Sequence, residues 1–306
     1  MSTLATLTPQ PHAAAMPELT RRCRALAQSA GVNVTPLPEL QVIRADAPTD
    51  ILPTVYEPCL CVVLQGRKQT ELGQERYVYQ PGHFLVVSLT LATRARIIDA
   101  SPTQPYLCLR VSLDLGVIAS QLATAELVRE PSRDGRGLFL APMNAPLADS
   151  LLRLLQALDQ PGELPVMAPL LLQEVQYRVL VGPMGQQLAR LVETGGHAQR
   201  VARAVEHLKR HYEQPLRIAD LAAHAHMSPS SLHHRFKELT AMTPLQFQKQ
   251  LRLHEARRLM LGEGLAAATA GHRVGYASPS QFSRDYRQLF GAPPRQSVQA
   301  VIGGTR

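Results

Sequence analysis

"SPSSLHHRFKEL" (Ser228–Leu239) and, 50 residues later, "SPSQFSRDYRQL" (Ser278–Leu289) are two versions of one short segment. Both begin with Ser-Pro. Ser is a favoured N-cap, and Pro suits the first helical position, where its missing N–H costs nothing. Apolar residues follow in each copy at i, i+4 and i+7, which is the spacing of one buried stripe on a helix. The sequence therefore predicts two short helices built to the same design.

The stripe opposite the apolar one is polar or basic in both copies, but its middle residues differ. It consists of Ser230, His233, His234 and Lys237 in the first copy and of Ser280, Ser283, Arg284 and Arg287 in the second. Two helices that share a scaffold and differ in their outward side chains are suited to reading two different surfaces.

A short helix and a tight turn precede each copy, at Ile218–Ser228 and Ala266–Ser278. Helix, short turn and second helix form the helix-turn-helix unit, whose second helix enters the DNA major groove. Between the copies, residues 243–261 predict one long helix that starts with a capping box at Thr243 and Gln246. A rigid spacer of this kind would let one chain engage successive major-groove segments, which lie ~34 Å apart.

The net charge of +8 is concentrated in the last third of the chain. Residues 200–306 contain 16 Lys and Arg against seven Asp and Glu, whereas residues 1–199 contain 16 basic and 17 acidic residues. A basic domain beside a nearly neutral one is typical of proteins that bind a polyanion such as nucleic acid.

The segment from about Ala198 to Pro294 resembles the DNA-binding domain of the AraC/XylS family of bacterial transcription regulators. The resemblance rests on "IADLAAHAHMSPSSLHHRFKELTAMTP", "RLHEARRLM" and "VGYASPSQFSRDYRQLFGAPP". It implies base contacts from Ser230, His233, His234, Ser280, Ser283 and Arg284. Arg284 is the strongest of these predictions, because Arg bonds bidentately to the O6 and N7 of guanine.

Four further basic residues of this domain are interpreted as phosphate contacts or as ordinary solvated charges. They are Arg235, Lys237, Arg252 and Arg287. Gly271 departs from the family pattern in the helix before the second copy. Glycine within a helix costs ~1 kcal/mol relative to alanine, which predicts a looser second unit.

The first half of the chain has the pattern of strands. "TVYEPCLCVVLQGRKQTELGQERYVYQPGHFLVVSLTLATRARII" is rich in Val, Leu and Tyr and is divided by Gly and Pro-Gly turns, which is typical of an antiparallel barrel or sandwich. Helices follow at residues 148–159 and 168–182. We therefore expect an α+β protein. An N-terminal antiparallel β half-barrel with flanking helices would precede an all-α domain of two helix-turn-helix units joined by a long helix.

The stretch "PCLCVVLQGRKQTELGQERYVYQPGHFLVVS" resembles the N-terminal domain of one subgroup of the same family, over about Val55 to Leu113. This resemblance implies a cupin-like half-barrel that binds a small effector, with adjoining helices available for dimerisation. The expected domains are a tail and first helix at 1–40, the effector and dimerisation domain at 41–194, and the DNA-binding domain at 195–306.

An enzymatic barrel is the alternative, and the residues disfavour it. The barrel region has a single histidine, His83, so the histidines and carboxylate of a facial metal triad are not available. The chain has no nucleophile elbow, phosphate loop or dinucleotide fingerprint. We predict no metal, no cofactor and no catalysis. The competing interpretation, a metal-free binding or enzymatic barrel with a basic helical accessory domain, does not account for the repeated helix.

Cys59, Cys61 and His83 are weaker candidates for contact with the effector. Residues i and i+2 of a strand point to the same face, so both thiols are expected to face the barrel interior together with Val63. They would report an electrophile or oxidant if one of them had a depressed pKa. The plainer interpretation, two small buried apolar residues, is favoured on general grounds.

The expected partners are double-stranded promoter DNA and a small effector whose identity the residues do not indicate. RNA polymerase and a second copy of the chain are further partners that the resemblance allows, with activation favoured over repression. No run approaches the ~20 apolar residues that a membrane span requires. Together with the sparse cysteines and the lack of a secretory signal, this predicts a cytoplasmic protein.

Overall fold

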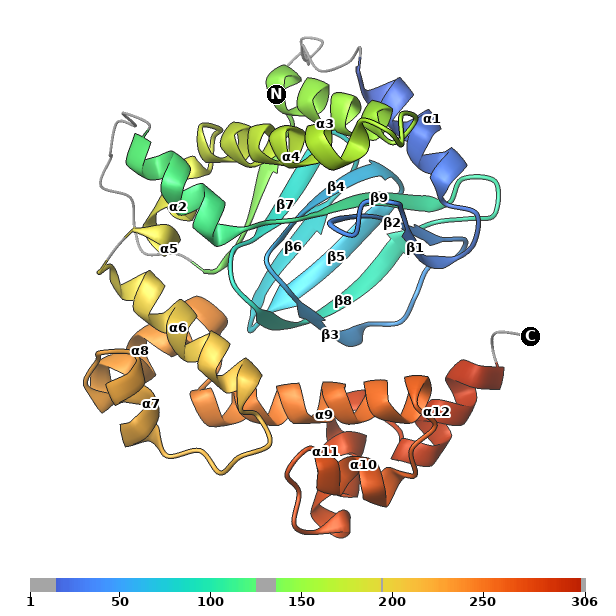
Figure 1. The fold of residues 1–306 in the computed structure, drawn as a ribbon. Helices are drawn as coiled ribbons and strands as arrows, with labels where there is room; N and C mark the ends of the chain where they lie inside the picture. The colour runs from blue at the N-terminus through green and yellow to red at the C-terminus, as the bar shows by residue number, and fades with distance from the viewer. Residues whose placement is uncertain (1–14, 125–135, 194, 304–306) are drawn as a thin grey trace, which may run out of the picture.

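The N-terminal half folds into two antiparallel β-sheets that face each other (Figure 1). The computed structural model describes residues 15–124, 136–193 and 195–303. In spatial order, the six-stranded sheet consists of β1 (Gly31–Val34), β2 (Leu40–Ala45), β9 (Tyr106–Ser112), β4 (Cys59–Gln65), β7 (His83–Val87) and β10 (Leu138–Pro142). The four-stranded sheet consists of β3 (Leu52–Tyr56), β8 (Leu91–Asp99), β5 (Arg67–Leu72) and β6 (Glu75–Tyr79). The predicted antiparallel half-barrel is confirmed.

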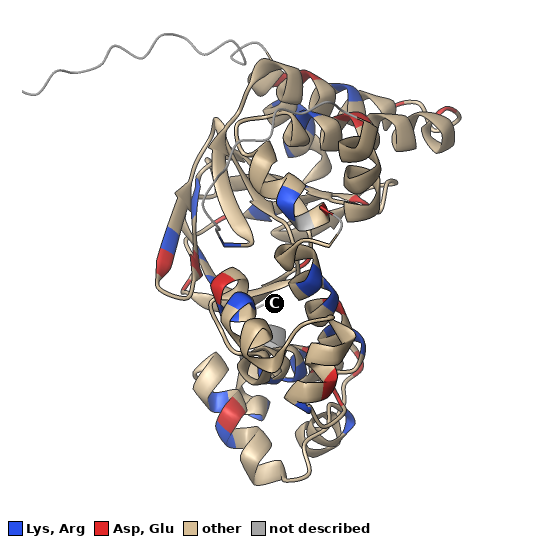
Figure 2. Cartoon of the chain, turned by 90° about the vertical axis from the view of Figure 1, so that its left-hand side faces the viewer, with Lys and Arg blue, Asp and Glu red and all other residues tan. Residues whose placement is uncertain are grey.

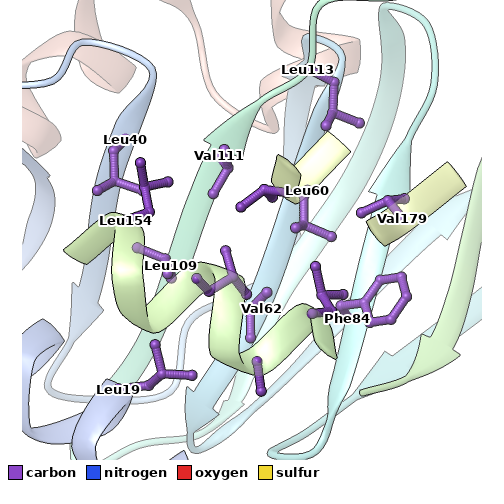
Figure 3. Packing of buried hydrophobic residues seen from close by; sticks show 14 of the residues in the cluster. Leu19, Leu40, Leu60, Val62, Phe84, Leu109, Val111, Leu113, Leu154 and Val179 are labelled. Carbon is purple, nitrogen blue, oxygen red and sulfur yellow. The ribbon is translucent and has the colours of Figure 1, made fainter. Parts of the chain in front are cut away.

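Helices cover the outer face of the six-stranded sheet. They are α1 (Ala15–Leu26), α2 (Leu115–Thr124), α3 (Ala145–Ala157), α4 (Leu164–Leu180) and α5 (Gly185–Val192). Figure 3 shows Leu19 of α1 and Leu154 of α3 among the sheet residues Leu60, Val62 and Leu109, and all five side chains are fully buried. The apolar faces predicted for α3 and α4 are therefore buried mainly against the barrel.

Strand β4 is buried on both of its faces. Leu60, Val62 and Leu64 belong to the cluster under the helices, whereas Cys59, Cys61 and Val63 belong to the cluster between the two sheets. This alternation follows from the two-residue period of a strand. The prediction that both thiols face the barrel interior is confirmed.

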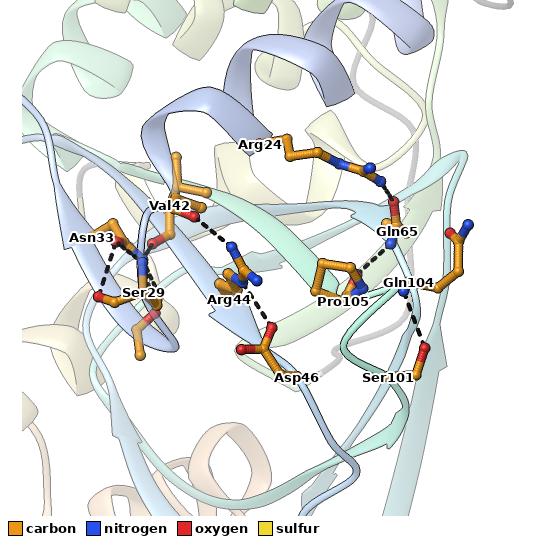
Figure 4. Close-up of polar contacts among 12 residues, drawn as sticks. Arg24, Ser29, Asn33, Val42, Arg44, Asp46, Gln65, Ser101, Gln104 and Pro105 are labelled. Atoms are coloured by element: carbon orange, nitrogen blue, oxygen red, sulfur yellow. Dashed lines mark hydrogen bonds and ion pairs between the residues drawn. The ribbon is translucent and has the colours of Figure 1, made fainter. Parts of the chain in front are cut away.

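The edge of the six-stranded sheet differs from expectation, since residues 31–34 form strand β1 inside the segment that we expected to hold only a tail and a helix. Val32 and Val34 are largely exposed, so the strand lacks the alternation of burial that marks a strand in a sequence. Polar contacts attach this corner to the barrel (Figure 4). The Arg44 guanidinium donates to the carboxylate of Asp46 at 2.7 Å and to the carbonyl of Ala27 at 3.0 Å.

The C-terminal half is entirely helical. Its helices are α6 (His197–Arg210), α7 (Ile218–His224), α8 (Pro229–Thr240), α9 (Pro244–Gly262), α10 (Ala267–Arg273), α11 (Pro279–Phe290) and α12 (Pro294–Gly303). The predicted helix starts are confirmed. Ser228 and Ser278 accept hydrogen bonds at the N-termini of α8 and α11, and Thr243 and Gln246 form the capping box of α9.

The two helix-turn-helix units are buried in different ways. Leu232 and Phe236 of α8 belong to the same apolar cluster as the interior of the barrel. Phe282 and Tyr286 of α11 belong to a separate cluster formed by C-terminal residues alone. None of the helices in the described ranges has the length and hydrophobicity required to cross a lipid bilayer.

Candidate nucleic-acid interface

The outward stripes of α8 and α11 are accessible. The six predicted base-contacting residues are all exposed: Ser230, His233, His234, Ser280, Ser283 and Arg284. On the opposite side of each helix, Phe236 and Phe282 are at most 1% exposed, so burial of the apolar stripe determines which side chains point outward. The Arg284 guanidinium donates to the Gln281 side chain at 2.8 Å, one turn nearer the start of α11.

Basic residues surround these stripes, and Figure 2 shows Lys and Arg distributed along the C-terminal helices. Lys237 and Arg287, in the last turns of α8 and α11, are exposed and available to a phosphate. Arg235 is half-buried and forms an ion pair with Glu238 at 2.9 Å, so a phosphate would have to compete with that carboxylate.

Arg252 lies in a junction between the two units, where we had expected a phosphate contact. Its guanidinium donates to the backbone carbonyls of Tyr212 at 2.6 Å, Glu213 at 3.1 Å, Gln214 at 2.9 Å and Gly275 at 3.2 Å. Arg has five N–H donors, so few remain for DNA. The phosphate contact expected of Arg252 stays a prediction, and a phosphate would have to compete with these four carbonyls. The sequence shows that the residue is basic and helical, but not that carbonyls from two distant loops converge on it.

The same junction brings two backbones into direct contact. Gly275, in the turn of the second unit, has φ +91°, and a Cβ atom there would lie 2.1 Å from the Glu213 carbonyl oxygen. Gln248 donates to the carbonyls of Tyr212 and Gln214 at 3.0 and 2.7 Å. Loop residues 212–214 precede the first unit, so the junction connects the start of that unit to the turn of the second.

The glycine at position 271 is explained by the packing of α10 against α11. A Cβ atom at this position would lie 2.8 Å from the ring of Phe282, so only glycine allows α10 to approach α11 this closely. The close contact offsets the lower helix propensity, and the looser second unit expected from Gly271 is not required.

The first reading helix ends against the barrel in an arrangement that we call the interdomain clamp. Arg136, which precedes β10, donates to the carbonyls of Lys237 at 3.0 Å and Glu238 at 2.6 Å, and it pairs with Glu75 of β6 at 2.8 Å. The Gly137 N–H donates to the Leu239 carbonyl at 3.1 Å. Sequence reasoning missed Arg136, because its partners lie 101 and 102 residues away and no local pattern marks it.

A second contact joins the two halves of the chain. Lys209 of α6 forms an ion pair with Glu57 at 2.7 Å, and the hydroxyl of Thr90 donates to the same carboxylate oxygen at 2.8 Å.

Beside the clamp lies a hollow of about 600 Å³, lined by Arg136, Ser230, His233, His234, Lys237 and Glu238. The stripe of α8 therefore faces a space that is also lined by Arg136 of the N-terminal half.

In the described part of the chain, no group of three or more His, Cys, Asp or Glu side chains is arranged to hold a metal ion. His83 is at the start of β7, and its Nδ1 atom is buried without a partner there. On α6, burial and the charges of His224 and His211 lower the pKa of His207. The histidines of this region form contacts among their rings.

Two family models match the chain and together cover both halves. A model described as the AraC-type transcriptional regulator N-terminus matches residues 36–187, and a helix-turn-helix domain model matches residues 221–300. The chain belongs to the AraC family of transcriptional regulators. The family resemblance predicted from the two reading helices and from the barrel is confirmed.

Known relatives of this AraC-family chain are regulators of transcription. The probable thc operon regulatory protein of Rhodococcus erythropolis is 27% identical over 251 residues, which are 78% of this chain and 75% of that protein. The HTH-type transcriptional regulator ArgR of Pseudomonas aeruginosa is 27% identical over 128 residues, which are 42% of this chain and 39% of ArgR. The match to ArgR thus takes in less than half of that protein's length.

Solved structures share the fold. ToxT from Vibrio cholerae has a TM-score of 0.61 at 12% identity, with 85% of this chain and 97% of ToxT covered. A ToxT structure with a bound unsaturated fatty acid has a TM-score of 0.57 at 9% identity, with 85% and 94% covered. At identities this low, the structural likeness shows that the two proteins share an α+β fold.

Replacing Arg252 by Ala is expected to weaken the spacing preference for the two halves of a DNA site, because the substitution removes four bonds that hold the units together. Binding is measured to sites whose halves are ~10 bp apart and to the same sites with one base pair added or removed. Hydrogen bonds to charged groups contribute ~1.5–3 kcal/mol each, so we also expect the free energy of unfolding to fall by at least ~2 kcal/mol.

Arg258→Ala on the same helix is the matched control, because this side chain is 58% exposed and pairs with Glu255 and Glu263. It should change neither quantity appreciably. An Arg252→Ala variant that discriminates between spacings as sharply as the wild type does would show that the junction does not set the spacing.

Proposed function

We propose that this AraC-family regulator binds a bipartite site in promoter DNA, one half through α8 and the other through α11, under the control of a small effector held by the barrel. The observation that carries the proposal is the pair of exposed, N-capped helices whose outward stripes differ while a single junction joins their units. Because the proposed target is promoter DNA, we expect the protein to act in the cytoplasm. No step of the proposal is enzymatic.

Individual roles follow from side-chain chemistry. Arg284 bonds bidentately to a guanine, and Ser280 and Ser283 contact neighbouring bases in the same half-site. In the other half-site, Ser230, His233 and His234 contact base edges. Lys237 and Arg287 contact phosphates, and Arg235 does so in competition with Glu238.

The effector acts on the relation between the barrel and the first unit. In the described conformation the clamp fastens the C-terminus of α8 to the barrel, and the stripe of α8 faces a hollow bordered by Arg136. Binding inside the barrel shifts Glu75 or Arg136, releases α8 and lets the chain pivot at Gly195-Gly196. The unsaturated fatty acid bound to ToxT, a protein of this fold, supports a small organic effector. Cys59, Cys61 and His83 are the residues of the barrel that we assigned to effector contact.

Transcription is then activated through contact with RNA polymerase, since a released first unit would let both units occupy DNA next to the enzyme. A homologous regulator, RhaS from Pectobacterium carotovorum, is named as a transcriptional activator and is 28% identical over 110 residues. Activation, and not repression, is thus proposed by likeness to RhaS.

We further propose that two copies associate through α4. Val166, Leu170, Tyr177 and Val181 are 68, 55, 37 and 41% exposed and follow one another at helical spacing along this helix. The same stripe on a second copy would cover it in a two-fold symmetric contact. Such a contact would present four helix-turn-helix units to DNA.

Replacing Leu170 by Glu is expected to convert a dimer into a monomer at micromolar concentration, because a carboxylate would be buried at the centre of the contact. Sedimentation velocity measures the change. Leu245→Glu on α9, where the leucine is 63% exposed, is the control and should leave the mass unchanged. A wild-type protein that sediments as a monomer would contradict this contact.

Arg284→Ala is expected to relax base preference at one position of one half-site, at a cost of ~1–3 kcal/mol on the preferred sequence. The measurement is selection from a random DNA library, carried out in parallel with the wild type and the variant. Arg287→Ala is the control, because loss of a phosphate contact should weaken binding uniformly and reduce the salt dependence by about one ion. Identical selected sequences for wild type and Arg284→Ala would contradict the assignment.

Arg136→Ala is expected to raise the affinity of the effector-free protein for its selected site by ~10-fold or more, because the clamp no longer holds α8. A fluorescence anisotropy titration measures this affinity. Arg76→Ala is the control, since Arg76 is 63% exposed and pairs only with Glu71 among the described residues. Equal affinities for wild type and Arg136→Ala would exclude an inhibitory role for the clamp.

A further inference from the structure

Three thiols lie together in the interior of the barrel. Cys59 and Cys61 on β4 and Cys108 on the adjacent β9 are all at most 2% exposed. The Sγ atoms of Cys59 and Cys61 are 3.8 Å apart. The register places Val63 opposite Cys108, so Cys61 and Cys108 are diagonal neighbours on the same face of the sheet.

An ammonium group reaches this cluster from the opposite sheet. The Nζ atom of Lys68 on β5 lies 5.3 Å from the ring centroid of Tyr56 and 6.0 Å from that of Tyr106. Among the described residues, the charged or ionisable side chains that act most strongly on Lys68 are Tyr56, Cys108 and Cys61, and no carboxylate forms an ion pair with it. A half-buried cation without a carboxylate partner favours an electron-rich group nearby.

Two phenol groups next to Lys68 have hydrogen-bonding capacity that the described residues leave unused. The hydroxyls of Tyr56 and Tyr106 are buried, with Lys68 and Cys108 beside them but no partner at ordinary hydrogen-bond geometry among the described residues. The hydroxyl of Tyr79, in contrast, is 3.0 Å from that of Thr70. Buried tyrosine hydroxyls normally have a partner, so these two donors mark a place for an oxygen atom.

The surroundings make one of the thiols acidic. Hydrogen bonds from Cys108 and Cys59, together with the charges of Lys68 and Arg110, hold the pKa of Cys61 well below its usual range against the opposing effect of burial. The hydrogen bond to Cys61 and burial raise the pKa of Cys59 and of Cys108. The direction of these shifts distinguishes Cys61 from the other two thiols, because the thiolate is the nucleophilic form of cysteine.

We propose that Cys61 captures a small α,β-unsaturated carbonyl compound inside the barrel, with Lys68, Tyr56 and Tyr106 holding its carbonyl oxygen. Three donors and a soft sulfur nucleophile within one closed layer suit an electrophile whose oxygen accepts hydrogen bonds while its β-carbon meets the sulfur. Cys61, Tyr56 and Tyr106 are buried in a closely packed layer, so only a compound of few non-hydrogen atoms would fit among them. This inference rests on the proposed function in taking that compound as the effector.

The chemistry balances without an oxidant. The electron pair of the Cys61 thiolate forms an S–C bond to the β-carbon, and the π electrons of the C=C bond move toward the carbonyl oxygen. That oxygen takes a proton from the Lys68 ammonium or from a phenol, and the enol then tautomerises to the saturated carbonyl. The proton that Cys61 lost on ionisation replaces the donated one, so the net reaction is addition of the thiol S–H across C=C.

The interior is connected to the first reading helix. Cys59 and Cys61 belong to the apolar cluster that also contains Leu232 and Phe236 of α8. Protein interiors are close-packed, so added atoms in this cluster must displace neighbours. An adduct at Cys61 would therefore press on the packing that holds α8 against the barrel.

The test uses the full-length protein and acrolein as the probe, with adducts located by mass spectrometry of peptides. We expect an adduct at Cys61 formed at least tenfold faster than any adduct at Cys23. Cys23 is the internal control, because it is equally buried, lies on the helix side of the sheet, and burial raises its pKa to about 12. Cys61→Ser should abolish the rapid adduct, and Lys68→Met should slow it about tenfold.

The pH dependence of the adduct rate distinguishes a thiol that ionises easily from one that is only accessible to the reagent. The wild-type rate should stay high well below pH ~8.5, the ordinary thiol value, and Lys68→Met should move the profile upward. Adducts formed at Cys23 as fast as at Cys61 would overturn the proposal, as would modification only after unfolding. Circular dichroism of each variant shows whether it is folded when its rate is measured.

DNA binding is measured separately, on the unreacted protein and on the adduct. Failure of the unreacted protein to select any DNA sequence, in the absence and presence of acrolein, contradicts the proposed function but leaves the adduct measurement standing. A Cys61 adduct that leaves the affinity for the selected site unchanged overturns the assignment of this compound class as the effector. An affinity change of at least tenfold, absent from Cys61→Ser, supports it.

Discussion

The burial of β4 on both faces is the constraint on which the rest of the protein depends. Its even-numbered residues hold the helices α1, α3 and α4 on one side, and its odd-numbered residues form one wall of the barrel interior on the other. A strand of alternating period therefore separates a purely structural core from a layer that contains thiols, phenols and an ammonium group. The seven residues of β4 thus contribute to the structural core with one face and to the chemically reactive layer with the other.

The two helix-turn-helix units share a design but not their surroundings. The first unit shares its apolar cluster with the barrel and is held by the clamp, whereas the second has its own cluster of C-terminal residues. Because the Arg252 junction joins the two units, a displacement of the first unit would carry the second unit with it.

Local signals in the sequence predicted the local structure well. The Ser-Pro starts, the capping box at Thr243 and the inward direction of Cys59 and Cys61 all depend on residues within one turn or two positions of each other. The exposure of the two stripes followed for the same reason. The domain boundaries and the individual DNA contacts stay predictions. Strand β1 was missed because an exposed edge strand has no burial pattern, and the structural bonds of Arg252 were missed because its partners are carbonyls of remote loops.

The sequence by itself determined the family, the two reading helices and which of their side chains face outward, since helical periodicity and capping are short-range effects. Only the tertiary structure decided how these helices are held. Arg136 contacts α8 across about 100 residues of chain, Gly275 contacts Glu213 backbone to backbone, and the charge of Lys68 acts on Cys61 from the opposite sheet. Such contacts depend on where distant segments come together in space, and no local pattern of residues encodes them.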